Sequence, residues 1–483
     1  MRHAGSYGKT PHEAPIAPLR FSRSDRPNCF DKRKTIFAYW AAQKRILNEG
    51  GGRLARQVLC LFGPAISKTQ LKQGREGTAM NALIRFKNVA PLFVIALSLV
   101  TATATTTDVI FSFEEDNGEY ADTDLETDSS GNIYGTTVLG GDHGSGTVFQ
   151  LSPTPNGWVQ NVLYSFTGGA DGGEPYKGVS IDRQGNLYGT AVTGGSGSCE
   201  GGCGVAYKLT NSGGTWTQTV IHAFTGGDDG SGPGARVTVD RSGNVYGMTP
   251  TGGAYGVGTI YKLHPHAGSW TLQVIHTFTG GADGSSGSAG RMLLSHGLLY
   301  GAATTGGLYG AGVVFELTPT TGGEWDFRTL YSFHGQPDGS FPYGALLQAP
   351  SGKLYGTTYY GGANGIGAVY ELVPRSTGEW HESIIYSFQN GSDGNSPISN
   401  LVRDAAGNLY GTTSEGGLGS GTIFKLSPSG GGQWTESVVH AFDGPPDGGF
   451  SYNGMVVDPF GNFYGATVHG GTADDGCVYQ FTP

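Results

Sequence analysis

Aspartate recurs in one sequence context along the chain, and a carboxylate repeated at a fixed position is a candidate cation ligand. An Asp-Gly pair follows a phenylalanine by five residues in six places: Asp171, Asp229, Asp283, Asp338, Asp393 and Asp447. Asp-Gly pairs also complete tight turns, because glycine accepts a positive φ. Two interpretations are therefore open: turns that every copy needs, or a ring of carboxylates that attracts calcium or a cationic ligand.

A second recurring aspartate begins the sequence Asp-x-x-Gly-Asn. Its positions are Asp128, Asp182, Asp240, Asp404 and Asp458. The carboxylate can accept hydrogen bonds from turn amides, and Gly and Asn tolerate the backbone of a tight hairpin. A calcium loop would need several carboxylates at alternate positions, and this sequence has one. We predict hairpin turns here.

Cysteine and histidine give little indication of catalysis. Cys199 and Cys203 lie in the longest insertion between repeated segments, and we predict a disulfide that closes this loop. Two cysteines alone are few for zinc, which usually takes four ligands. Three histidines stand where another copy has Tyr164, which indicates a structural role: His222, His276 and His440. The sequence contains no G-x-S-x-G, H-E-x-x-H or Walker A motif.

All these residues belong to a tandem repeat. A Tyr-Gly pair, usually within Gly-Asn-Leu-Tyr-Gly-Thr, occurs seven times, at Tyr134, Tyr188, Tyr246, Tyr300, Tyr355, Tyr410 and Tyr464. A fixed period near 50 residues is typical of propeller blades, and kelch-type blades have about this length. Each copy holds four short segments rich in aromatic and β-branched residues between glycine-rich turns. In the second copy the segments cover 178–182, 186–192, 204–209 and 216–224.

The two ends of the repeat array complement one another. Six copies have a fourth segment that runs from a tryptophan to a phenylalanine, as from Trp216 to Phe224, but the last copy stops after its third segment, 478–481. Residues 108–113 imitate the missing segment. We therefore predict an all-β fold, a seven-bladed β-propeller of four-stranded antiparallel blades, closed by the N-terminal strand that completes the last blade.

One position on the predicted innermost strand varies while its surroundings repeat. Strand direction alternates within a blade, so the loop entering a blade and the loop between its second and third strands share one face. Twelve residues before each Tyr-Gly tyrosine, at that face, stand Asp122, Tyr176, Gly234, Ser288, Tyr343, Ile398 and Tyr452. A ligand site must be asymmetric, and tyrosines can stack on a sugar. We predict that Asp122, Tyr176, Tyr343 and Tyr452 bind a ligand at the axial mouth; the alternative is that the tyrosines only fill the opening.

The repeated motifs D-x-x-G-N-L-Y-G-T-T, G-T-V-F-x-L and W-x-x-x-x-L-Y-S-F resemble those of the GloVer tandem-repeat family of secreted bacterial proteins. The resemblance covers residues 108–483. It implies export and a repeat array, and it supplies no catalytic residues. Many members carry a C-terminal surface anchor, which we do not expect here because the sequence ends at Pro483 without a hydrophobic segment.

The N-terminal part has a composition of its own. Residues 80–104 place Arg85 and Lys87 before an apolar run and end in Ala-x-Ala, which predicts a secretory signal peptide cleaved after Ala104. The run is short for a membrane span of ~20 residues. Residues 1–79 carry 15 Lys and Arg against 5 Asp and Glu. They are interpreted either as the product of a wrongly chosen upstream start codon or as a basic extension.

Residues 105–483 form the predicted propeller and carry 12 Lys and Arg against 34 Asp and Glu. Such an acidic surface disfavours nucleic acid and anionic lipid. We therefore expect a secreted, extracellular monomer with no nucleic-acid partner and no membrane contact once the signal peptide is cleaved.

Two functions are compatible with this architecture. The favoured one is a non-catalytic binding or scaffold module for an extracellular glycan or protein, because no catalytic set is present. The alternative is an extracellular enzyme, of the glycan hydrolase, lyase or metal-dependent lactonase type, with Asp122 and loop carboxylates at the mouth. Acid/base chemistry would need two carboxyl groups about 5 to 9.5 Å apart with different pKa values. Calcium is the cofactor that the sequence leaves open.

Overall fold

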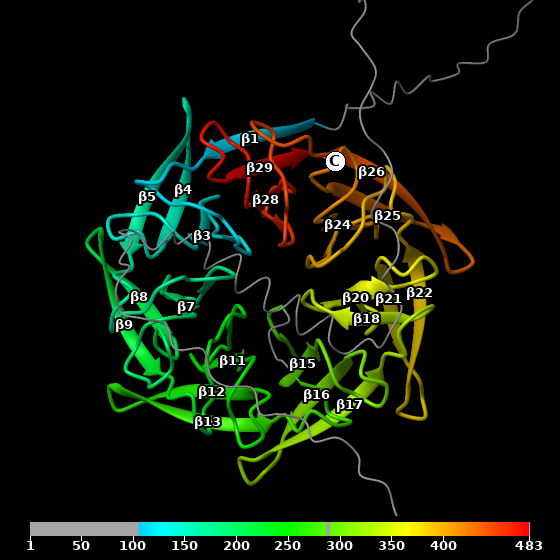
Figure 1. Ribbon diagram of the computed structural model, residues 1–483, viewed down its shortest axis with the longest axis horizontal. Coiled ribbons are helices and arrows are strands. Elements are labelled where there is room, and N and C mark those ends of the chain that lie inside the picture. Colours follow the sequence, from blue (N-terminus) through cyan, green and yellow to red (C-terminus); the bar gives the residue numbers. More distant parts are fainter. Residues whose placement is uncertain (1–105, 286–289, 483) are drawn as a thin grey trace, which may run out of the picture. The chain divides into compact units, whose positions relative to one another are not determined.

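The computed structural model describes residues 106–285 and 290–482, and these residues form seven antiparallel sheets. The sheets are arranged as blades around a central axis (Figure 1). This confirms the predicted seven-bladed β-propeller. The predicted signal peptide and the N-terminal basic segment, residues 1–104, lie outside the described residues. Among the residues that are described, no helix is long and apolar enough to cross a membrane.

Blades 1 to 4 follow one another along the chain. Blade 1 consists of β2 (Glu126–Thr127), β3 (Ile133–Thr137), β4 (Thr147–Thr154) and β5 (Gly157–Ser165). Blade 2 consists of β6 (Ser180–Ile181), β7 (Leu187–Ala191), β8 (Val205–Ser212) and β9 (Thr215–Ala223). Blade 3 consists of β10 (Thr238–Val239), β11 (Val245–Thr249), β12 (Thr259–His266) and β13 (Ser269–Thr277). Blade 4 consists of β14 (Leu293–Ser295), β15 (Leu298–Ala303), β16 (Val313–Pro319) and β17 (Trp325–Ser332).

Blade 5 has an additional strand and blade 7 joins the two ends of the array. Blade 5 consists of β18 (Gly339–Pro342), β19 (Leu347–Gln348), β20 (Leu354–Gly361), β21 (Ala368–Pro374) and β22 (Trp380–Ser387). Blade 6 consists of β23 (Val402–Arg403), β24 (Leu409–Thr413), β25 (Thr422–Gly430) and β26 (Gln433–Ala441). Blade 7 consists of β27 (Val456–Val457), β28 (Phe463–Thr467), β29 (Cys477–Thr482) and β1 (Thr106–Ser112).

The predicted closure is confirmed. Strand β1 pairs antiparallel with β29, so that Thr107 lies opposite Phe481 and Ser112 lies opposite Cys477. The amide of Phe113 continues the contact by donating to the carbonyl of Gly476 (3.0 Å). The first described strand therefore forms the outer edge of the last blade (Figure 1).

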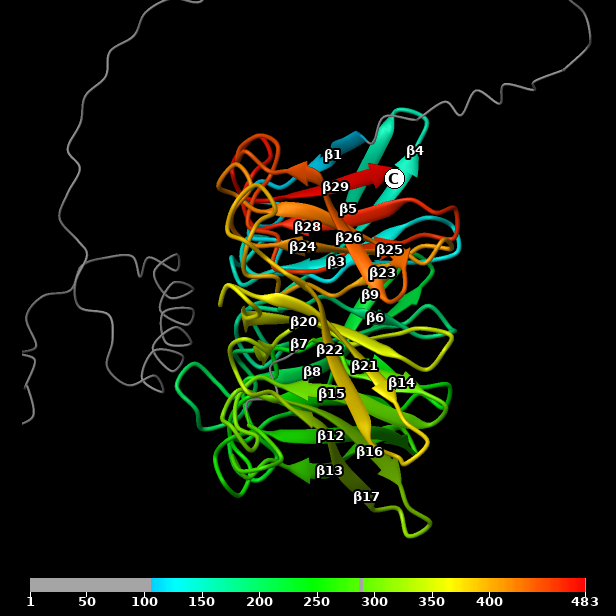
Figure 2. The ribbon, with the colours of Figure 1, turned by 90° about the vertical axis from the view of Figure 1, so that its right-hand side faces the viewer.

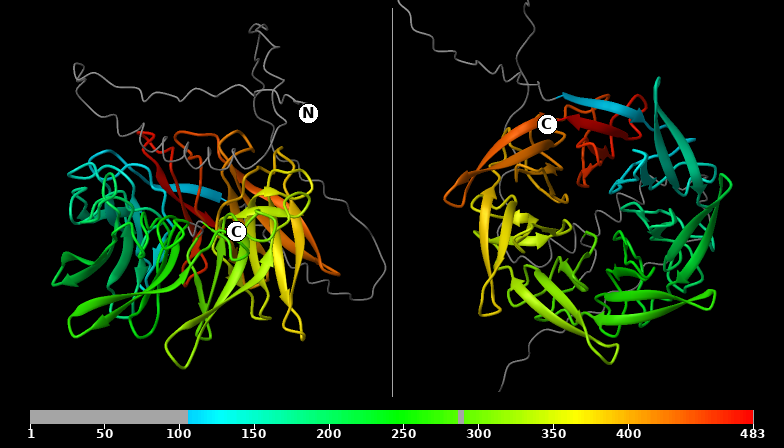
Figure 3. Two further views of the ribbon diagram at one scale, coloured as in Figure 1. Left: turned by 60° about the horizontal axis from the view of Figure 1, so that its bottom comes forward. Right: turned by 180° about the vertical axis from the view of Figure 1, so that it is seen from behind.

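Each blade runs from a short inner strand to long outer strands. In blade 2 the inner strand has two residues, shorter than the five predicted, whereas the third strand extends beyond its predicted end at Leu209 to Ser212. The outer hairpins, β4–β5 and β16–β17 among them, extend to one side of the ring, as Figure 2 and the left view of Figure 3 show. The loops that enter the blades lie on the other side.

The contacts made by the Tyr-Gly pair explain why this motif recurs in the blades. In most blades the tyrosine ring packs edge-on against the tryptophan of the fourth and outermost strand, here called strand d, of the next blade, as Tyr188 does against Trp270 at 6.1 Å between ring centroids. Where the predicted hairpin turn contains its aspartate, the tyrosine hydroxyl donates to that carboxylate, as from Tyr188 to Asp182 (3.0 Å). Asp182 also accepts from the Asn186 amide (2.9 Å), which confirms that this repeated aspartate belongs to a turn. The glycine leaves room for an aromatic ring on the third strand of the blade.

Candidate functional site at the axial mouth

The loop that enters each blade holds one residue in the left-handed backbone conformation. Its amide donates to a carbonyl of the preceding blade, as from Phe341 to Ala311 (2.9 Å) and from Phe450 to Ser420 (2.9 Å). The described residues at this position are Tyr120, Glu174, Gly232, Phe341, Ser396 and Phe450. The conformation therefore helps to join neighbouring blades. Glycine adopts it without strain and bulky residues rarely do, so the backbone alone does not explain the three aromatic side chains.

The loop face is divided into two unlike parts. Five residues after the Tyr-Gly tyrosine, blades 2 to 4 have threonine, and two of these small side chains pair with serines: Thr251 with Ser231 (2.8 Å) and Thr305 with Ser285 (2.7 Å). Blades 5, 6 and 7 instead have Tyr360, Glu415 and His469 at this position. The repeat thus changes from small hydroxyl groups to large or charged side chains over consecutive blades.

Aromatic side chains of blades 5, 7 and 1 gather on the second part. His469 lies between Tyr120 and Phe450, with ring centroids at 5.7 and 5.5 Å, and Phe450 also contacts Tyr452 at 6.4 Å. In blade 5, Tyr360 contacts Phe341 at 5.8 Å and Tyr359 at 4.3 Å. We call this set the aromatic arc: Tyr120, Phe341, Tyr359, Tyr360, Phe450, Tyr452 and His469.

The charge of Glu415 of blade 6 affects the pKa values of two tyrosines of the aromatic arc, Tyr359 of blade 5 and Tyr452 of blade 7. Burial raises the pKa of Tyr452, and the charges of Asp122 and Glu415 raise it further. Burial likewise raises the pKa of Tyr359, with Tyr360 and Glu415 as further causes. Both phenols therefore stay protonated at neutral pH and keep a hydroxyl group that can donate a hydrogen bond.

A polar centre lies beside the aromatic arc. Asp122 is 9% exposed, and its Oδ1 accepts from Lys177 Nζ (2.7 Å) and Asn453 Nδ2 (2.7 Å). Lys177 also donates to Asn453 Oδ1 (2.8 Å). The three residues, which we call the polar centre, belong to blades 1, 2 and 7. The contact between Lys177 and Asn453 therefore spans blade 1 at the inner end of its entering loop.

Further charged residues near the inner strands form contacts between blades. Asp124 accepts from Asn400 Nδ2 (2.8 Å), across blade 7. Arg236 is buried and ion-pairs with Glu126, and its Nη1 donates to the carbonyl of Leu125 (3.2 Å). Burial and then the nearby Arg291 lower the pKa of Arg236 to about 9, still protonated at neutral pH. These contacts join blades 1, 3 and 6 at or just before their inner strands.

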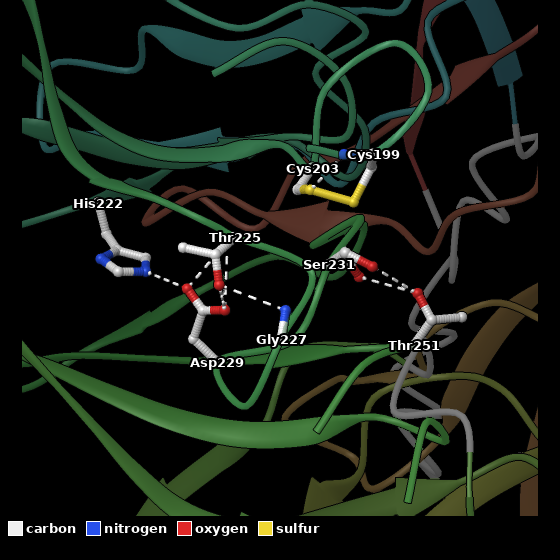
Figure 4. The surroundings of a disulfide bond; sticks show 8 residues. All are labelled: Cys199, Cys203, His222, Thr225, Gly227, Asp229, Ser231 and Thr251. Carbon is white, nitrogen blue, oxygen red and sulfur yellow. Dashed lines mark hydrogen bonds and ion pairs between the residues drawn. A yellow bond between two sulfur atoms is a disulfide. The ribbon is translucent and has the colours of Figure 1, made fainter. Parts of the chain in front are cut away.

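The repeated aspartates that follow the strand-d phenylalanine form local turns. Asp229 accepts from His222 Nε2 (3.0 Å) and from the Thr225 amide (3.0 Å), as Figure 4 shows. The same arrangement, with Tyr or His seven residues before the aspartate, recurs at Asp171, Asp283, Asp338, Asp393 and Asp447. In the part of the chain that the structure describes, no group of three or more His, Cys, Asp and Glu side chains is arranged to hold a metal. The turn interpretation accounts for the contacts of these carboxylates, and calcium binding stays a prediction.

The insertion in blade 2 is closed by a disulfide between Cys199 and Cys203 (Figure 4). The Cys203 carbonyl accepts from the amide of Gly232 (2.9 Å), the left-handed residue of blade 3. The closed loop thus contributes to the joint between blades 2 and 3. Cys477 is a buried free thiol, and burial raises its pKa to about 11.

The carboxyl groups with strongly raised pKa values lie away from the mouth. Burial, then a neighbouring aspartate, raises the pKa of Glu382 to about 8 and that of Glu436 to about 7. These residues stand on the outer strands β22 and β26. At the mouth, Asp122 is already held by Lys177 and Asn453. The arrangement there suits hydrogen bonding and stacking better than proton transfer.

Comparison with protein families gives a match that covers the whole propeller. The sequence model of the Gloeobacter/Verrucomicrobia repeat matches four overlapping ranges, 96–293, 152–348, 196–420 and 288–483. The chain belongs to the Gloeobacter/Verrucomicrobia repeat family. Its sequence matches none of the curated proteins.

Solved structures resemble this member of the Gloeobacter/Verrucomicrobia repeat family at low sequence identity. A protein from Lactobacillus plantarum is 15% identical with a TM-score of 0.47, over 73% of this chain and 99% of its own. A Bacteroides uniformis protein assigned as a 6-phosphogluconolactonase is 14% identical with a TM-score of 0.43, over 66% and 84%. A Thermus thermophilus protein assigned as an oxidoreductase (glucose dehydrogenase) is 17% identical with a TM-score of 0.38, over 63% and 95%.

The structure places the predicted binding residues of this family member in different surroundings. Asp122 belongs to the polar centre and Tyr452 to the aromatic arc. Tyr176 and Tyr343 are half-buried in the entering loops of blades 2 and 5. Ser288, the equivalent residue of blade 4, lies outside the described residues.

Most of this site was not predicted from the sequence: Lys177, Asn453 and Glu415 were missed, and so was every member of the aromatic arc except Tyr452. A signal for the first two was present, because the position directly after the variable one also differs among copies. Its described residues are Thr123, Lys177, Ala235, Gly344, Ser399 and Asn453. A lysine and an asparagine among small side chains indicate a local role.

Proposed function

We propose that this member of the Gloeobacter/Verrucomicrobia repeat family is a secreted, non-catalytic binding module that holds a glycan at the axial mouth. The observation that carries the proposal is the asymmetry of the loop face. Blades 2 to 4 have small hydroxyl side chains, whereas blades 5, 7 and 1 supply the aromatic arc. Packing needs would repeat from blade to blade, so a change confined to one part of the ring fits a ligand site.

The chemistry of the two groups suits a sugar. Half-buried aromatic rings such as Tyr360 and Phe450 offer faces and edges on which the C–H surface of a sugar ring can pack. The carboxylates and amide of Asp122, Glu415 and Asn453 can exchange hydrogen bonds with sugar hydroxyls, which fixes orientation. A mostly apolar wall with a few convergent polar groups is the common pattern of such sites.

Export is part of the proposal. The disulfide between Cys199 and Cys203 fits an oxidising compartment, where such bonds persist. Mass spectrometry of the protein from the culture medium of its native host should find an N-terminus directly after Ala104. Recovery only from the cytoplasm, with residues 80–104 still attached, would contradict secretion.

The binding proposal is tested on a polysaccharide array with the secreted protein. We expect retention on at least one polysaccharide, and a loss of tenfold or more in affinity for Phe450→Ala and Tyr360→Ala. Tyr255→Ala is the matched control, because Tyr255 is 63% exposed on a loop of blade 3, outside the aromatic arc. No retention of the wild-type protein, or an equal loss with Tyr255→Ala, would overturn the proposal.

A further inference from the structure

One position on the outer strands contacts the preceding blade. It is the second residue after the strand-d tryptophan. In blade 1, Gln160 Nε2 donates to the carbonyl of Asn117 (3.0 Å), and in blade 2, Gln218 Nε2 donates to the carbonyl of Asp171 (3.0 Å). Both acceptors belong to the loop that leads from the preceding blade into the blade of the glutamine. A neutral amide donor thus joins adjacent blades here.

Blade 5 has a carboxyl group at this position. Glu382 faces the loop that connects blade 4 to blade 5. Tyr331, on β17 of blade 4, donates to Oδ2 of Asp338 in this loop (2.9 Å), and its hydroxyl lies 3.5 Å from Glu382 Oε2. The charge of Asp338 also acts on Glu382 and helps to raise the pKa of its carboxyl group. Glu382 Oε1 and Asp338 Oδ1 are both buried without a hydrogen-bond partner among the described residues. A carboxyl proton on one of these atoms would supply the missing donor.

Blade 6 repeats the arrangement. Glu436 faces the loop that connects blade 5 to blade 6. Tyr386, on β22 of blade 5, donates to Oδ2 of Asp393 in this loop (2.9 Å), and its hydroxyl lies 3.5 Å from Glu436 Oε2. Glu436 Oε1 is buried without a hydrogen-bond partner among the described residues. The two oxygens of Asp393 already accept from the amides of Gly391 and Gln389, so this joint is better satisfied than that of blade 4 with blade 5.

We propose that Glu382 and Glu436 make the joints between blades 4, 5 and 6 sensitive to pH: the protonated carboxyl group replaces the glutamine amide of blades 1 and 2, and the ionised group repels the aspartate of the loop that connects its blade to the preceding one. The propeller is then closed most firmly on this side at acidic pH. Its blades 4 to 6 loosen in alkaline solution, while the joints of Gln160 and Gln218 do not respond.

The groups around each glutamate support this direction. Tyr331 and Asp338 face Glu382 from blade 4, and the buried Tyr370 faces it from its own blade. His334 contacts Asp338 and not Glu382, and Arg328 donates to the carbonyl of Gly378. For Glu436, the facing groups are Tyr386 and Asp393.

The pH window follows from linkage. Burial and then Asp338 raise the pKa of Glu382 from 4.5 to about 8, and burial and then Asp393 raise that of Glu436 from 4.5 to about 7. The folded state therefore binds these protons more tightly than the unfolded chain. Their contribution to stability is fully present below about pH 4.5 and is lost as the pH rises to about 7 for Glu436 and about 8 for Glu382.

The test compares Tm between pH 4.5 and pH 9 for the full-length protein and Glu382→Gln/Glu436→Gln. We expect equal Tm values at pH 4.5 and a Tm of the double variant higher by roughly 2–4 °C or more at pH 9. Glu371→Gln is the control, because Glu371 lies on β21 and pairs with Lys353 (3.1 Å) instead of a carboxylate. Gln218→Glu should introduce a decline of Tm with pH at a joint that lacks one.

A second measurement locates the change. Hydrogen exchange, corrected for intrinsic rates, should increase from pH 6 to pH 9 in the loop around Asp338 and in β22, and remain unchanged in the double variant. The proposal is overturned if the double variant follows the pH profile of the wild-type protein, or if Glu371→Gln flattens the profile to the same extent.

Discussion

The Nζ atom of Lys177 lies 2.7 Å from Oδ1 of Asp122, and this ion pair joins the entering loops of blades 1 and 2 just before their inner strands. The side chains are 16% and 12% exposed, so water screens the pair only weakly. Asn453 donates to the same carboxylate oxygen from the blade on the other side. The pair therefore holds the first, second and last blades together at the mouth where the ligand is proposed to bind.

Removing the cation of Lys177 alone should lower the free energy of unfolding more than removing the charges of both Lys177 and Asp122. We expect Lys177→Met to lower the free energy of unfolding by about 2–3 kcal/mol, because Asp122 would remain buried with its charge and lose its partner. Asp122→Asn combined with Lys177→Met should cost less than the sum of the two single changes. Denaturant unfolding of all four proteins gives this coupling directly. Strictly additive losses would mean that the two side chains do not act as a pair.

The ring closure can be locked by one substitution. Ser112 and Cys477 lie opposite one another in the pairing of β1 with β29, and opposed residues of an antiparallel pair project from the same face. Ser112→Cys should therefore form a disulfide with the natural Cys477 during oxidative folding. The bond would stabilise the propeller by about 2–4 kcal/mol, and reduction should abolish the gain.

The control for this bond is Ser165→Cys. Ser165 holds the equivalent place in blade 1 and lies opposite Thr147, so no disulfide can form there. Mass spectrometry under non-reducing conditions should find, within residues 105–483, no free thiol in Ser112→Cys and two in Ser165→Cys. Free thiols at both 112 and 477 would contradict the register of the closing strands.

Buried tyrosine hydroxyls on the third strands offer a contrasting prediction. Tyr207 and Tyr261 are fully buried, and their hydroxyls have no hydrogen-bond partner among the described residues. The same place is held by phenylalanine in other blades, as at Phe149 and Phe315. Tyr261→Phe should leave the free energy of unfolding unchanged or raise it by up to about 1 kcal/mol, because no bond is lost and a buried polar group is removed.

The matched comparison uses a tyrosine that has a partner. Tyr410 donates to the carboxylate of Asp404 (3.2 Å), so Tyr410→Phe should lower the free energy of unfolding by about 1–2 kcal/mol. Chemical denaturation of both variants under one condition decides the matter. A larger loss for Tyr261→Phe than for Tyr410→Phe would show that the hydroxyl of Tyr261 has a role that its contacts do not reveal.

The ring and its closure could be predicted from the sequence because both depend on contacts that repeat. The Tyr-Gly pair recurs in all seven blades, the tryptophan of the fourth strand in six and the hairpin aspartate in five, and the missing fourth segment at one end is present at the other. The length of the inner strands was overestimated. Strand β6 pairs only through Ser180 and Ile181, although its sequence favours a longer strand. Strand limits depend on how the inner strands turn around the axis, which a local pattern does not encode.

The candidate site was predicted only in part, because its contacts join blades that are far apart in the sequence. The variable inner position pointed to Asp122 and Tyr452, but Lys177 meets Asn453 across 276 residues. The change from Gln218 to Glu382 at one strand position was visible in the sequence. Its meaning was not, because the partner of Glu382 is Asp338, which lies 44 positions earlier in the loop between blades 4 and 5.

The calcium interpretation of the loop aspartates can be tested at Asp229. Its carboxylate accepts from Thr225 and His222, so we expect Asp229→Ala to lower the free energy of unfolding by about 1–3 kcal/mol through the loss of these bonds. If the turn alone matters, the loss should be the same in EDTA and in millimolar calcium. Asp228→Ala, which removes an exposed carboxylate from the same loop, is the control and should have no effect in either buffer. A calcium-dependent rise in Tm that is present in the wild-type protein and absent in Asp229→Ala would instead establish a cation site, because only a metal ligand would make the cost of the substitution depend on calcium.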